Sequence, residues 1–172
     1  MVIQTERLSI RRICFEDWKA VRSIWAEVAG TRYAQYDRPH PTDDAAVMKR
    51  IETWSSFADS TEHMFYAVCL ADAVIGYFAL HQRETAFEIG YCFHPVFHGK
   101  GYAKESLAAL LDMLKARGYS CVIARAALKN GPSVGLLHSL QFRQIGSEKV
   151  SFYQDEQGRD VFFDGGIFER LL

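Results

Sequence analysis

Residues 88–106 read EIGYCFHPVFHGKGYAKES, and this stretch holds the strongest structural and functional signal in the chain. Its first part alternates apolar side chains with small or polar ones, which is typical of a strand. Its last part leads into KESLAALLDMLKARG, where leucines repeat at helical spacing until Gly118. Between the two lie Gly99, Gly101 and Ala103, whose small size lets the backbone approach a ligand closely. A helix that begins there presents unpaired N–H groups and positive partial charge, so the stretch predicts a phosphate site.

Two nucleotide-binding motifs fail on spacing. A Walker A loop requires Gly-Lys followed by Ser or Thr, but here Gly99-Lys100 is followed by Gly101-Tyr102. A dinucleotide fingerprint requires a small residue where this chain has Lys104, and an acidic residue after the next strand, where residues 128–130 are Leu-Lys-Asn. A nucleotide-binding protein with a degenerate loop therefore remains only as a weak hypothesis.

The rest of the chain alternates between strand and helix patterns. We expect a strand at 3–13, helices at 18–28 and from an N-cap at Thr42 to 54, strands at 64–70, 74–80 and 85–93, a strand at 121–128, a helix at 130–140, and two strands around the turn at 155–158. With the helix after Gly101, the order is β α α β β β α β α β β. This order predicts an α/β (α+β) fold with a mixed, largely antiparallel central sheet flanked by helices.

Length and composition narrow the protein class. With 172 residues and 49% hydrophobic side chains, the chain is expected to form a single domain over 1–172. A formal net charge of −1 argues against nucleic acid or an anionic membrane as partner, and no apolar run has spanning length. Cysteines occur at Cys14, Cys69, Cys92 and Cys121, without the spacing of a metal site or a disulfide framework. We therefore expect free thiols, no metal, and a cytoplasmic location.

The sequence HGKGYA at 98–103 resembles the pyrophosphate loop of the GNAT superfamily of N-acetyltransferases, whose motif is Gln/Arg-x-x-Gly-x-Gly/Ala. TERLSIRR at 5–12 is similar to that family's first strand, and NGPSVGLLHSLQF at 130–142 to its later helix. The resemblance covers nearly the whole chain, and the branch is similar to the ribosomal-protein N-terminal alanine acetyltransferases. It implies a GNAT-like acyl-CoA N-acyltransferase fold and acetyl-CoA-dependent, direct acetyl transfer to a primary amine of a small molecule or a protein N-terminus.

The resemblance also implies how coenzyme A is bound. Backbone N–H groups of the loop would hold its pyrophosphate, and these belong to His98, Gly99, Lys100, Gly101, Tyr102, Ala103 and Lys104. The preceding strand end would pair with the pantetheine arm through Tyr91, Cys92 and Phe93, with a β-bulge separating this strand from the next. Asn130 and Ser133 match polar positions near the thioester. Their alternative roles are a helix cap for Asn130 and a first-turn backbone hydrogen bond for Ser133.

The sequence offers fewer candidates for the groups that carry out acetyl transfer than for those that bind coenzyme A. The backbone N–H near Phe93 is the candidate oxyanion donor, and Glu88, a carboxylate on an otherwise apolar strand, is the candidate base. The alternative for Glu88 is a surface carboxylate paired with Arg or Lys. Cys92 as nucleophile of a ping-pong reaction is a weaker hypothesis, because no histidine stands in a recognisable partner pattern.

Two positions depart from the family pattern. His98 stands where Gln or Arg is usual, and Leu137 stands where many members carry a tyrosine as general acid. These departures motivate an alternative function, a non-catalytic acyl-CoA-binding regulatory module. The acceptor amine is not identified by the sequence. The segment 31–41 is expected to border its site, with Tyr33, Tyr36, Phe152 and Tyr153 either lining a pocket or packing in the core. The two C-terminal strands offer a surface for pairing as a homodimer.

Overall fold

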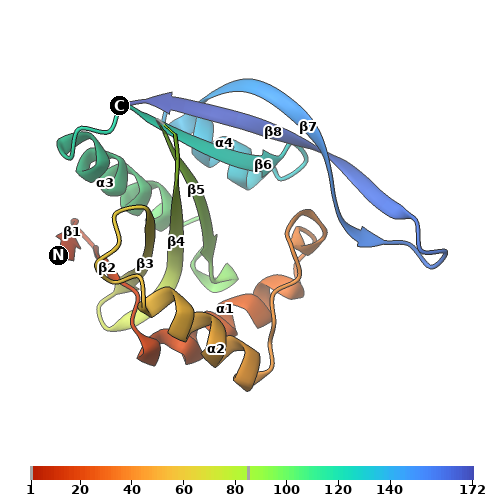
Figure 1. Cartoon of the computed structure of the whole chain (residues 1–172), viewed down its shortest axis with the longest axis horizontal. Helices are drawn as coiled ribbons and strands as arrows, with labels where there is room; N and C mark the ends of the chain where they lie inside the picture. Colours follow the sequence, from red (N-terminus) through yellow and green to blue (C-terminus); the bar gives the residue numbers. More distant parts are fainter. Residues whose placement is uncertain (1, 85) are drawn as a thin grey trace.

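The computed structural model describes residues 2–84 and 86–172, which form a sheet of eight strands with helices on both faces (Figure 1). The strands are β1 (Val2–Gln4), β2 (Leu8–Arg12), β3 (His63–Leu70), β4 (Ala73–Arg83), β5 (Ala86–Phe93), β6 (Cys121–Ala127), β7 (Arg143–Gln154) and β8 (Asp160–Leu171). The α-helices are α1 (Trp18–Ala29), α2 (Asp44–Ser55), α3 (Tyr102–Ala116) and α4 (Gly131–Ser139). Short 3₁₀ turns are η1 (Phe15–Asp17), η2 (Ala34–Tyr36) and η3 (Pro95–Phe97). The expected fold class and its largely antiparallel sheet are confirmed.

The sheet has the order β1-β2-β3-β4-β5-β6-β8-β7, and β5 and β6 are its parallel pair. These two strands pair only where residues 87–89 meet residues 122–124. Beyond that point β5 continues beside β4, whereas β6 continues beside β8 (Figure 1). The sheet therefore opens between the end of β5 and the end of β6.

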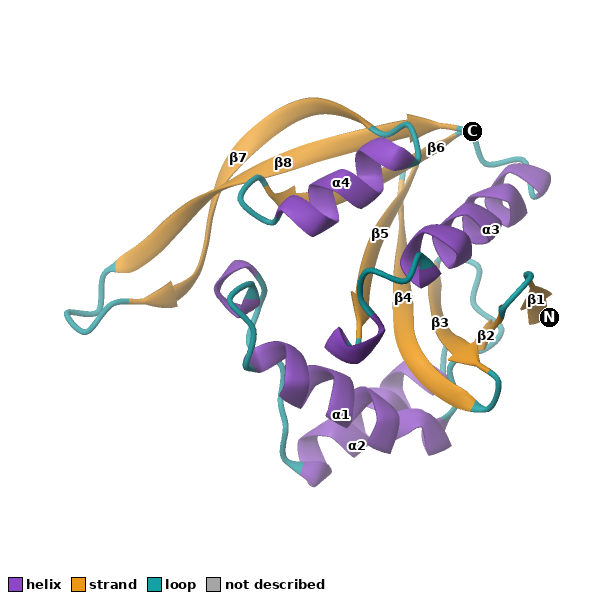
Figure 2. Cartoon of the chain, turned by 180° about the vertical axis from the view of Figure 1, so that it is seen from behind, coloured by secondary structure: helices purple, strands orange, loops and turns teal. Residues whose placement is uncertain are grey.

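Alternating side chains along the strands fill two separate cores. One face packs against the leucine stripe of α3 and against α4, with Tyr66, Phe78 and Phe87 among its buried strand residues. The other face packs against α1 and α2, with Phe65 and Tyr77 contributed by the strands. Figure 2 shows the two helix pairs on opposite sides of the sheet. Because successive side chains point to opposite faces and both faces are covered, β3 is buried from Met64 to Cys69 and β4 from Ile75 to Phe78.

Several predicted boundaries shift. The single strand expected at 3–13 is two strands, because the chain turns at 5–7, where the Thr5 N–H donates to the Leu8 carbonyl at 2.9 Å. The N-cap of α2 is Asp43 rather than Thr42, since the Asp43 carboxylate accepts the Ala46 N–H at 2.9 Å. The strand expected from Thr85 is described from Ala86, and Thr85 lies outside the described residues. Other expected helices and strands form within a few residues of their predicted ends.

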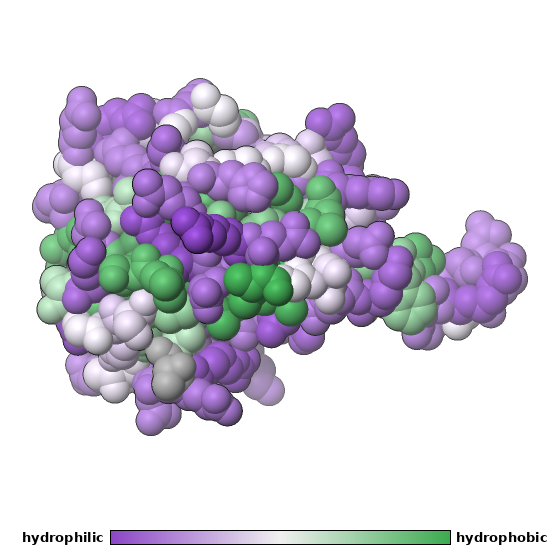
Figure 3. Space-filling model, turned by 90° about the horizontal axis from the view of Figure 1, so that it is seen from above, coloured by the Kyte–Doolittle hydropathy of each residue, from purple (hydrophilic) through white to green (hydrophobic). Residues whose placement is uncertain are grey.

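The hairpin of β7 and β8 extends beyond the body of the molecule as an arm (Figure 3). Its turn is closed by the Gly158 N–H, which donates to the Asp155 carbonyl at 2.9 Å, as the turn signal at 155–158 predicted. The arm exposes Tyr153, Val161 and Phe162, the last at 60%. In the part of the chain that the structure describes, no helix combines the length and apolar character needed to span a membrane.

Candidate functional site

The loop before α3 has the backbone shape that its glycines predicted. Gly99 and Gly101 lie in the left-handed region, at φ +72° and +82°. Gly101 is the cap residue of α3, and within the described chain no side chain caps this helix end. The N–H groups of the first turn consequently point out of the helix without a capping oxygen, which is the arrangement that binds an anion. A side chain at Gly101 would begin 3.3 Å from the Arg7 guanidinium, so this position also requires a small residue.

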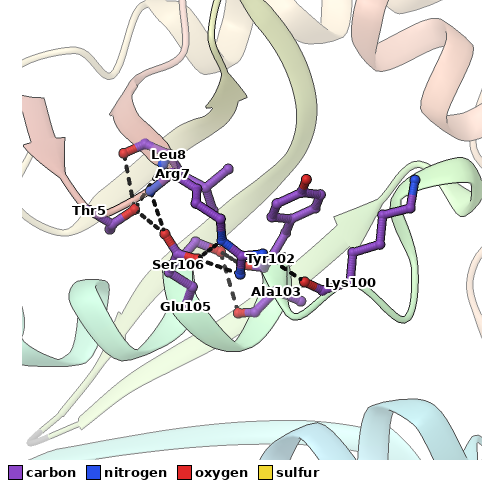
Figure 4. A network of polar contacts seen from close by, with 8 residues as sticks. All are labelled: Thr5, Arg7, Leu8, Lys100, Tyr102, Ala103, Glu105 and Ser106. Carbon is purple, nitrogen blue, oxygen red and sulfur yellow. Dashed lines mark hydrogen bonds and ion pairs between the residues drawn. The ribbon is translucent and has the colours of Figure 1, made fainter.

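A network of polar contacts ties this loop to the turn between β1 and β2 (Figure 4). Arg7 donates to the Lys100 carbonyl at 3.1 Å and pairs with Glu105 at 2.6 Å, and its guanidinium lies 4.7 Å from the centre of the Tyr102 ring. The Glu105 carboxylate also accepts the Thr5 hydroxyl at 2.6 Å and the Arg7 N–H at 2.9 Å. The contact with Arg7 therefore fixes the orientation of the peptide group between Lys100 and Gly101.

These contacts also affect the charge of Glu105. Desolvation acts to raise the pKa of Glu105, but hydrogen bonds from Thr5 and Arg7, together with the positive charge of Arg7, lower it below its ordinary value. Glu105 therefore stays ionised and keeps Arg7 in place beside the loop.

His98 contributes to the loop through its side chain. Its Nε2 lies 2.8 Å from the Phe93 carbonyl oxygen, and because a carbonyl only accepts, Nε2 carries the proton and donates. The imidazole thus fastens the loop to the end of β5. In a position where the related motif has Gln or Arg, His98 acts as a structural clamp.

The open edge of β5 carries backbone groups that β6 does not use. The His94 N–H donates to the Ile75 carbonyl of β4, so the N–H of the preceding residue, Phe93, points to the opposite edge, where the sheet opens. The same alternation puts the backbone groups of Tyr91 on that edge. The β4–β5 register runs without a shift from 86 to 93, so the bulge expected in β5 is absent. The opening arises because the pairing with β6 stops after Ile89.

Polar side chains face each other across this opening. The Tyr91 hydroxyl lies 2.7 Å from the Ser133 hydroxyl in α4, and burial raises the pKa of Tyr91 to about 12. The Asn130 side chain accepts the Ser133 N–H at 3.3 Å, so Asn130 caps α4 as its alternative role predicted. The Ser133 hydroxyl contacts the Tyr91 hydroxyl and does not make the first-turn backbone hydrogen bond that was its alternative role. The predicted site residues of β5, α4 and the loop therefore surround one opening in the sheet.

The surroundings of Cys92 and Leu137 argue against a chemical role for either side chain. Cys92 is buried on the other face of the sheet, and burial, followed by the negative charge of Asp37, raises the pKa of Cys92 to about 12. A thiol with this pKa is protonated near neutral pH and is a weak nucleophile. Leu137 is fully buried in the core, so its position supplies no proton donor.

Glu88 lies in an ion-pair network on the surface of the sheet. Its carboxylate accepts from Arg83 and from Arg125, each at 3.0 Å, and Arg125 also pairs with Glu148 at 2.9 Å. Desolvation acts to raise the pKa of Glu88, but the two arginines lower it below its ordinary value. This geometry matches the alternative stated for Glu88, a surface carboxylate paired with arginine. The role of Glu88 as the catalytic base stays a prediction.

The sequence analysis missed two groups of residues near the site. One is the Thr5–Arg7–Glu105 network, which joins residues about a hundred positions apart and leaves no local pattern. The other lies on the α1/α2 face, where His40 stacks on Trp25 with ring centres 4.7 Å apart, and Asp37 lies 3.4 Å from His40. The segment 31–41 was predicted to border the acceptor site, but its individual polar residues carried no recognisable motif.

Comparison with known proteins was made for the whole chain. Residues 7–143 match the family model of the acetyltransferase (GNAT) domain. The uncharacterized N-acetyltransferase YnaD of Bacillus subtilis (strain 168) is 26% identical over 166 residues, which cover 95% of this chain and 95% of YnaD.

Solved structures of ribosomal-protein acetyltransferases share the fold. An acetyl transferase from Salmonella typhimurium that modifies the N-terminal serine of 50S ribosomal subunit protein L7/L12 superposes with a TM-score of 0.85 at 18% identity, covering 100% of this chain and 99% of that one. RimL, a ribosomal L7/L12 alpha-N-protein acetyltransferase in complex with coenzyme A, gives a TM-score of 0.84 at 18% identity, covering 100% and 98%.

Proposed function

The chain belongs to the acetyltransferase (GNAT) family, and from this premise we propose that it transfers the acetyl group of acetyl-coenzyme A directly to a primary amine, on a small molecule or a protein N-terminus. One observation carries the proposal. The uncapped start of α3, with its two left-handed glycines, lies next to the open edge of β5. A ligand with a phosphate group at one end and an amide-containing chain at the other fits this combination.

The residues present suit coenzyme A. The loop amides from Gly99 to Lys104 would hold the pyrophosphate, because the uncapped helix end favours negative charge. The predicted contribution of the His98 amide is wrong, because this N–H already donates to the Pro95 carbonyl at 3.0 Å. Backbone groups of Tyr91 on the open edge would pair with an amide of the pantetheine arm. Phe93 does not take part as predicted, because its carbonyl is held by His98 and its N–H is left for the reacting carbonyl. The complex of RimL with coenzyme A, on the same fold, supports this assignment.

The chain's own groups also suit the chemical step. Acetyl-coenzyme A supplies an activated acetyl thioester. The Phe93 N–H, which points into the opening, would donate to the oxygen on which negative charge develops. The protonated state of Cys92 supports direct attack by the amine over a covalent enzyme intermediate.

The buried Leu137 favours one alternative. Without a phenol at this position, a non-catalytic acyl-CoA-binding regulatory module would keep the loop and the open edge but turn over no acceptor. The two functions differ in a single observable, the release of free thiol.

The experiment combines binding and turnover. Titration of the protein with acetyl-coenzyme A should give a micromolar dissociation constant, and a thiol-reactive dye should report thiol release when primary amines are added. Binding without release across amines and N-terminal peptides would support the regulatory module. Binding of ATP or NAD in place of coenzyme A would instead revive the nucleotide hypothesis.

The proposal extends to the cellular location and the oligomeric state of the protein. The described cysteines Cys14, Cys69, Cys92 and Cys121 are free thiols, which supports a reducing compartment such as the cytoplasm. The exposed apolar side chains of the β7–β8 arm support a homodimer, which sedimentation of the purified protein would test.

A further inference from the structure

A continuous series of contacts leads from the end of β5 to the segment between α1 and α2. Cys92 lies opposite Tyr77 in the β4–β5 register. The buried Tyr77 hydroxyl accepts the Trp25 indole N–H at 2.9 Å. The Trp25 ring in turn stacks against the His40 ring, with 7° between the two planes. His40 is therefore held in a fixed orientation on the α1/α2 side of the sheet, next to the strand whose open edge borders the opening.

Asp37 lies beside the Nε2 of His40. The Asp37 Oδ2 lies 3.4 Å from the His40 Nε2, while its Oδ1 accepts the Arg38 N–H at 2.7 Å. An ammonium group bound to Asp37 would therefore lie on the Nε2 side of the ring, where it can also donate to Nε2 when hydrogen is on Nδ1. The His40 side chain is 20% exposed and that of Asp37 is 52% exposed, so both are within reach of a ligand from solvent.

The negative charge of Asp37 acts on groups from three directions. It contributes, after burial, to the raised pKa of Cys92 at the end of β5 and to the raised pKa of Tyr153 on the β7–β8 arm. It also contributes to the raised pKa of Tyr77 in β4. From α2, the guanidinium of Arg50 lies 6.0 Å from the centre of the Trp25 ring. Asp37 is thus an exposed anionic group that faces the space between the strand end and the arm.

A groove adjoins the segment that holds Asp37. Its volume is about 320 Å³, and it is lined by the aromatic and apolar side chains of Tyr36, Tyr153, Val161, Phe162 and Phe163 together with Gln35, Lys129 and Asp164. Tyr36 lies edge-on to Phe163 at 5.4 Å, and the Tyr153 hydroxyl donates to the Ala34 carbonyl at 3.1 Å, so the arm and η2 form its two sides. A negative charge beside aromatic walls suits a cation attached to an uncharged, apolar body.

We infer that Asp37 and His40 form the acceptor site of this transferase, where Asp37 binds the ammonium group of an amine with an aromatic or aliphatic body and His40 accepts its proton. The inference rests on the proposed acetyl transfer and adds to it the base and the acceptor class. The imidazole Nε2 takes one proton from the ammonium, which leaves a neutral amine. The amine lone pair forms the C–N bond with the acetyl carbon, and the C–S bond breaks with its electron pair on sulfur. The second nitrogen-bound proton passes through water to the thiolate, giving an amide and a thiol.

The test uses the full chain, acetyl-coenzyme A and phenethylamine, a primary amine with an aromatic body. His40→Phe keeps a ring on Trp25 but removes the base, and it should lower kcat/KM at pH 7 by about 100-fold. The loss should shrink as the pH rises and the free amine forms. Asp37→Asn should raise the KM for phenethylamine by about 10-fold with a smaller change in kcat. The controls His138→Gln and Asp72→Asn change exposed residues of the same types elsewhere and should leave both constants within about 2-fold.

Two further readouts separate the possible failures. All variants should bind acetyl-coenzyme A within about 2-fold of the unmodified protein, which shows that they fold and keep the loop. Phenethylamine should shift the ring resonances of His40 in the unmodified protein and not in Asp37→Asn. If the unmodified protein binds acetyl-coenzyme A but acetylates no amine, the proposed function fails and the inference with it. If it acetylates amines while His40→Phe keeps its rate and pH profile, only the inference is overturned.

Discussion

The loop at 98–101 and the segment at 31–42 lie near the same end of β5, but the chain holds them in different ways. The loop is fixed by backbone: two left-handed glycines, the Lys100 carbonyl held by Arg7, and the Phe93 carbonyl held by His98. The segment is fixed by side chains, through the stacking of His40 on Trp25 and the hydroxyl of Tyr153 on Ala34. A backbone site recognises a group that every member of a family uses, whereas a side-chain site can change from one member to another.

The largest effect is expected at the backbone site. Gly101→Glu should weaken acetyl-coenzyme A binding by about 100-fold or more, because a side chain is strained at φ +82° and would distort the loop, and because it adds a negative charge at the helix end that would bind the phosphates. Isothermal titration measures the dissociation constant. The matched control is Gly158→Glu, which introduces the same side chain at φ +74° in the hairpin turn, where a Cβ meets no atom within 4 Å. Equal affinities of the two variants would remove the loop from the binding site.

A smaller effect is expected where Arg7 supports the loop. Arg7→Ala should weaken binding of acetyl-coenzyme A by about 5- to 10-fold, since the Lys100 carbonyl loses its partner but the loop amides remain. Arg22→Ala removes an exposed arginine that pairs with Asp44 on the helices of the opposite face, and it should leave the affinity unchanged. If both variants bind equally well, the network of Figure 4 does not shape the loop.

The same network predicts a pH-dependent stability. The pKa of Glu105 is lowered in the folded chain, so its ionised form stabilises the fold at pH above the unfolded value of about 4.3. This contribution is lost as the pH falls through the lowered value. Glu105→Gln should therefore reduce Tm at pH 7 by about 2 to 4 °C, and the difference should shrink as the pH falls below the unfolded value and disappear below the lowered pKa of Glu105. Glu156→Gln, in the exposed hairpin turn, should show no such pattern in thermal melts.

Hydrogen exchange compares the two regions in one experiment. Coenzyme A should slow exchange at the amides of 99–104 and of Tyr91 and Phe93 by about 10-fold, because the ligand gives these N–H groups partners. The amides of 34–40 should change little, since their site binds the acceptor. Protection of 34–40 that exceeds that of the loop would reverse the assignment of the two regions.

The smallest effect is expected at Glu88. Both its arginine partners lie at the surface, so Glu88→Gln should change stability little and leave the pH dependence of kcat/KM in place. Glu148→Gln, which removes another partner of Arg125, serves as the control. Loss of the acidic limb of the rate profile in Glu88→Gln alone would make Glu88 the base and contradict the role given to His40.

The difference between the two regions also explains what the sequence could predict. The order of elements and the loop could be predicted from local patterns, because glycine spacing and helical periodicity involve residues that are close together in the sequence. The sequence predicted that the sheet opens, but the predicted cause, a bulge in β5, is wrong. The opening arises where β6 stops pairing with β5, and the last paired residue of a strand depends on neighbouring strands that are distant in sequence. The turn at 5–7 was missed because Thr5 meets its partner Glu105 only in the folded chain. Asp37 and His40 were missed for the same reason, since their meaning depends on Trp25 from another helix.

The central claim is that this chain binds acetyl-coenzyme A at the loop before α3, and titration calorimetry of the purified protein tests it most directly. Acetyl-coenzyme A should bind with a micromolar dissociation constant, and ATP and NAD, used as controls, should not bind. An absence of heat with acetyl-coenzyme A, at protein concentrations that would reveal millimolar binding, would contradict the account and leave the fold without the function proposed for it.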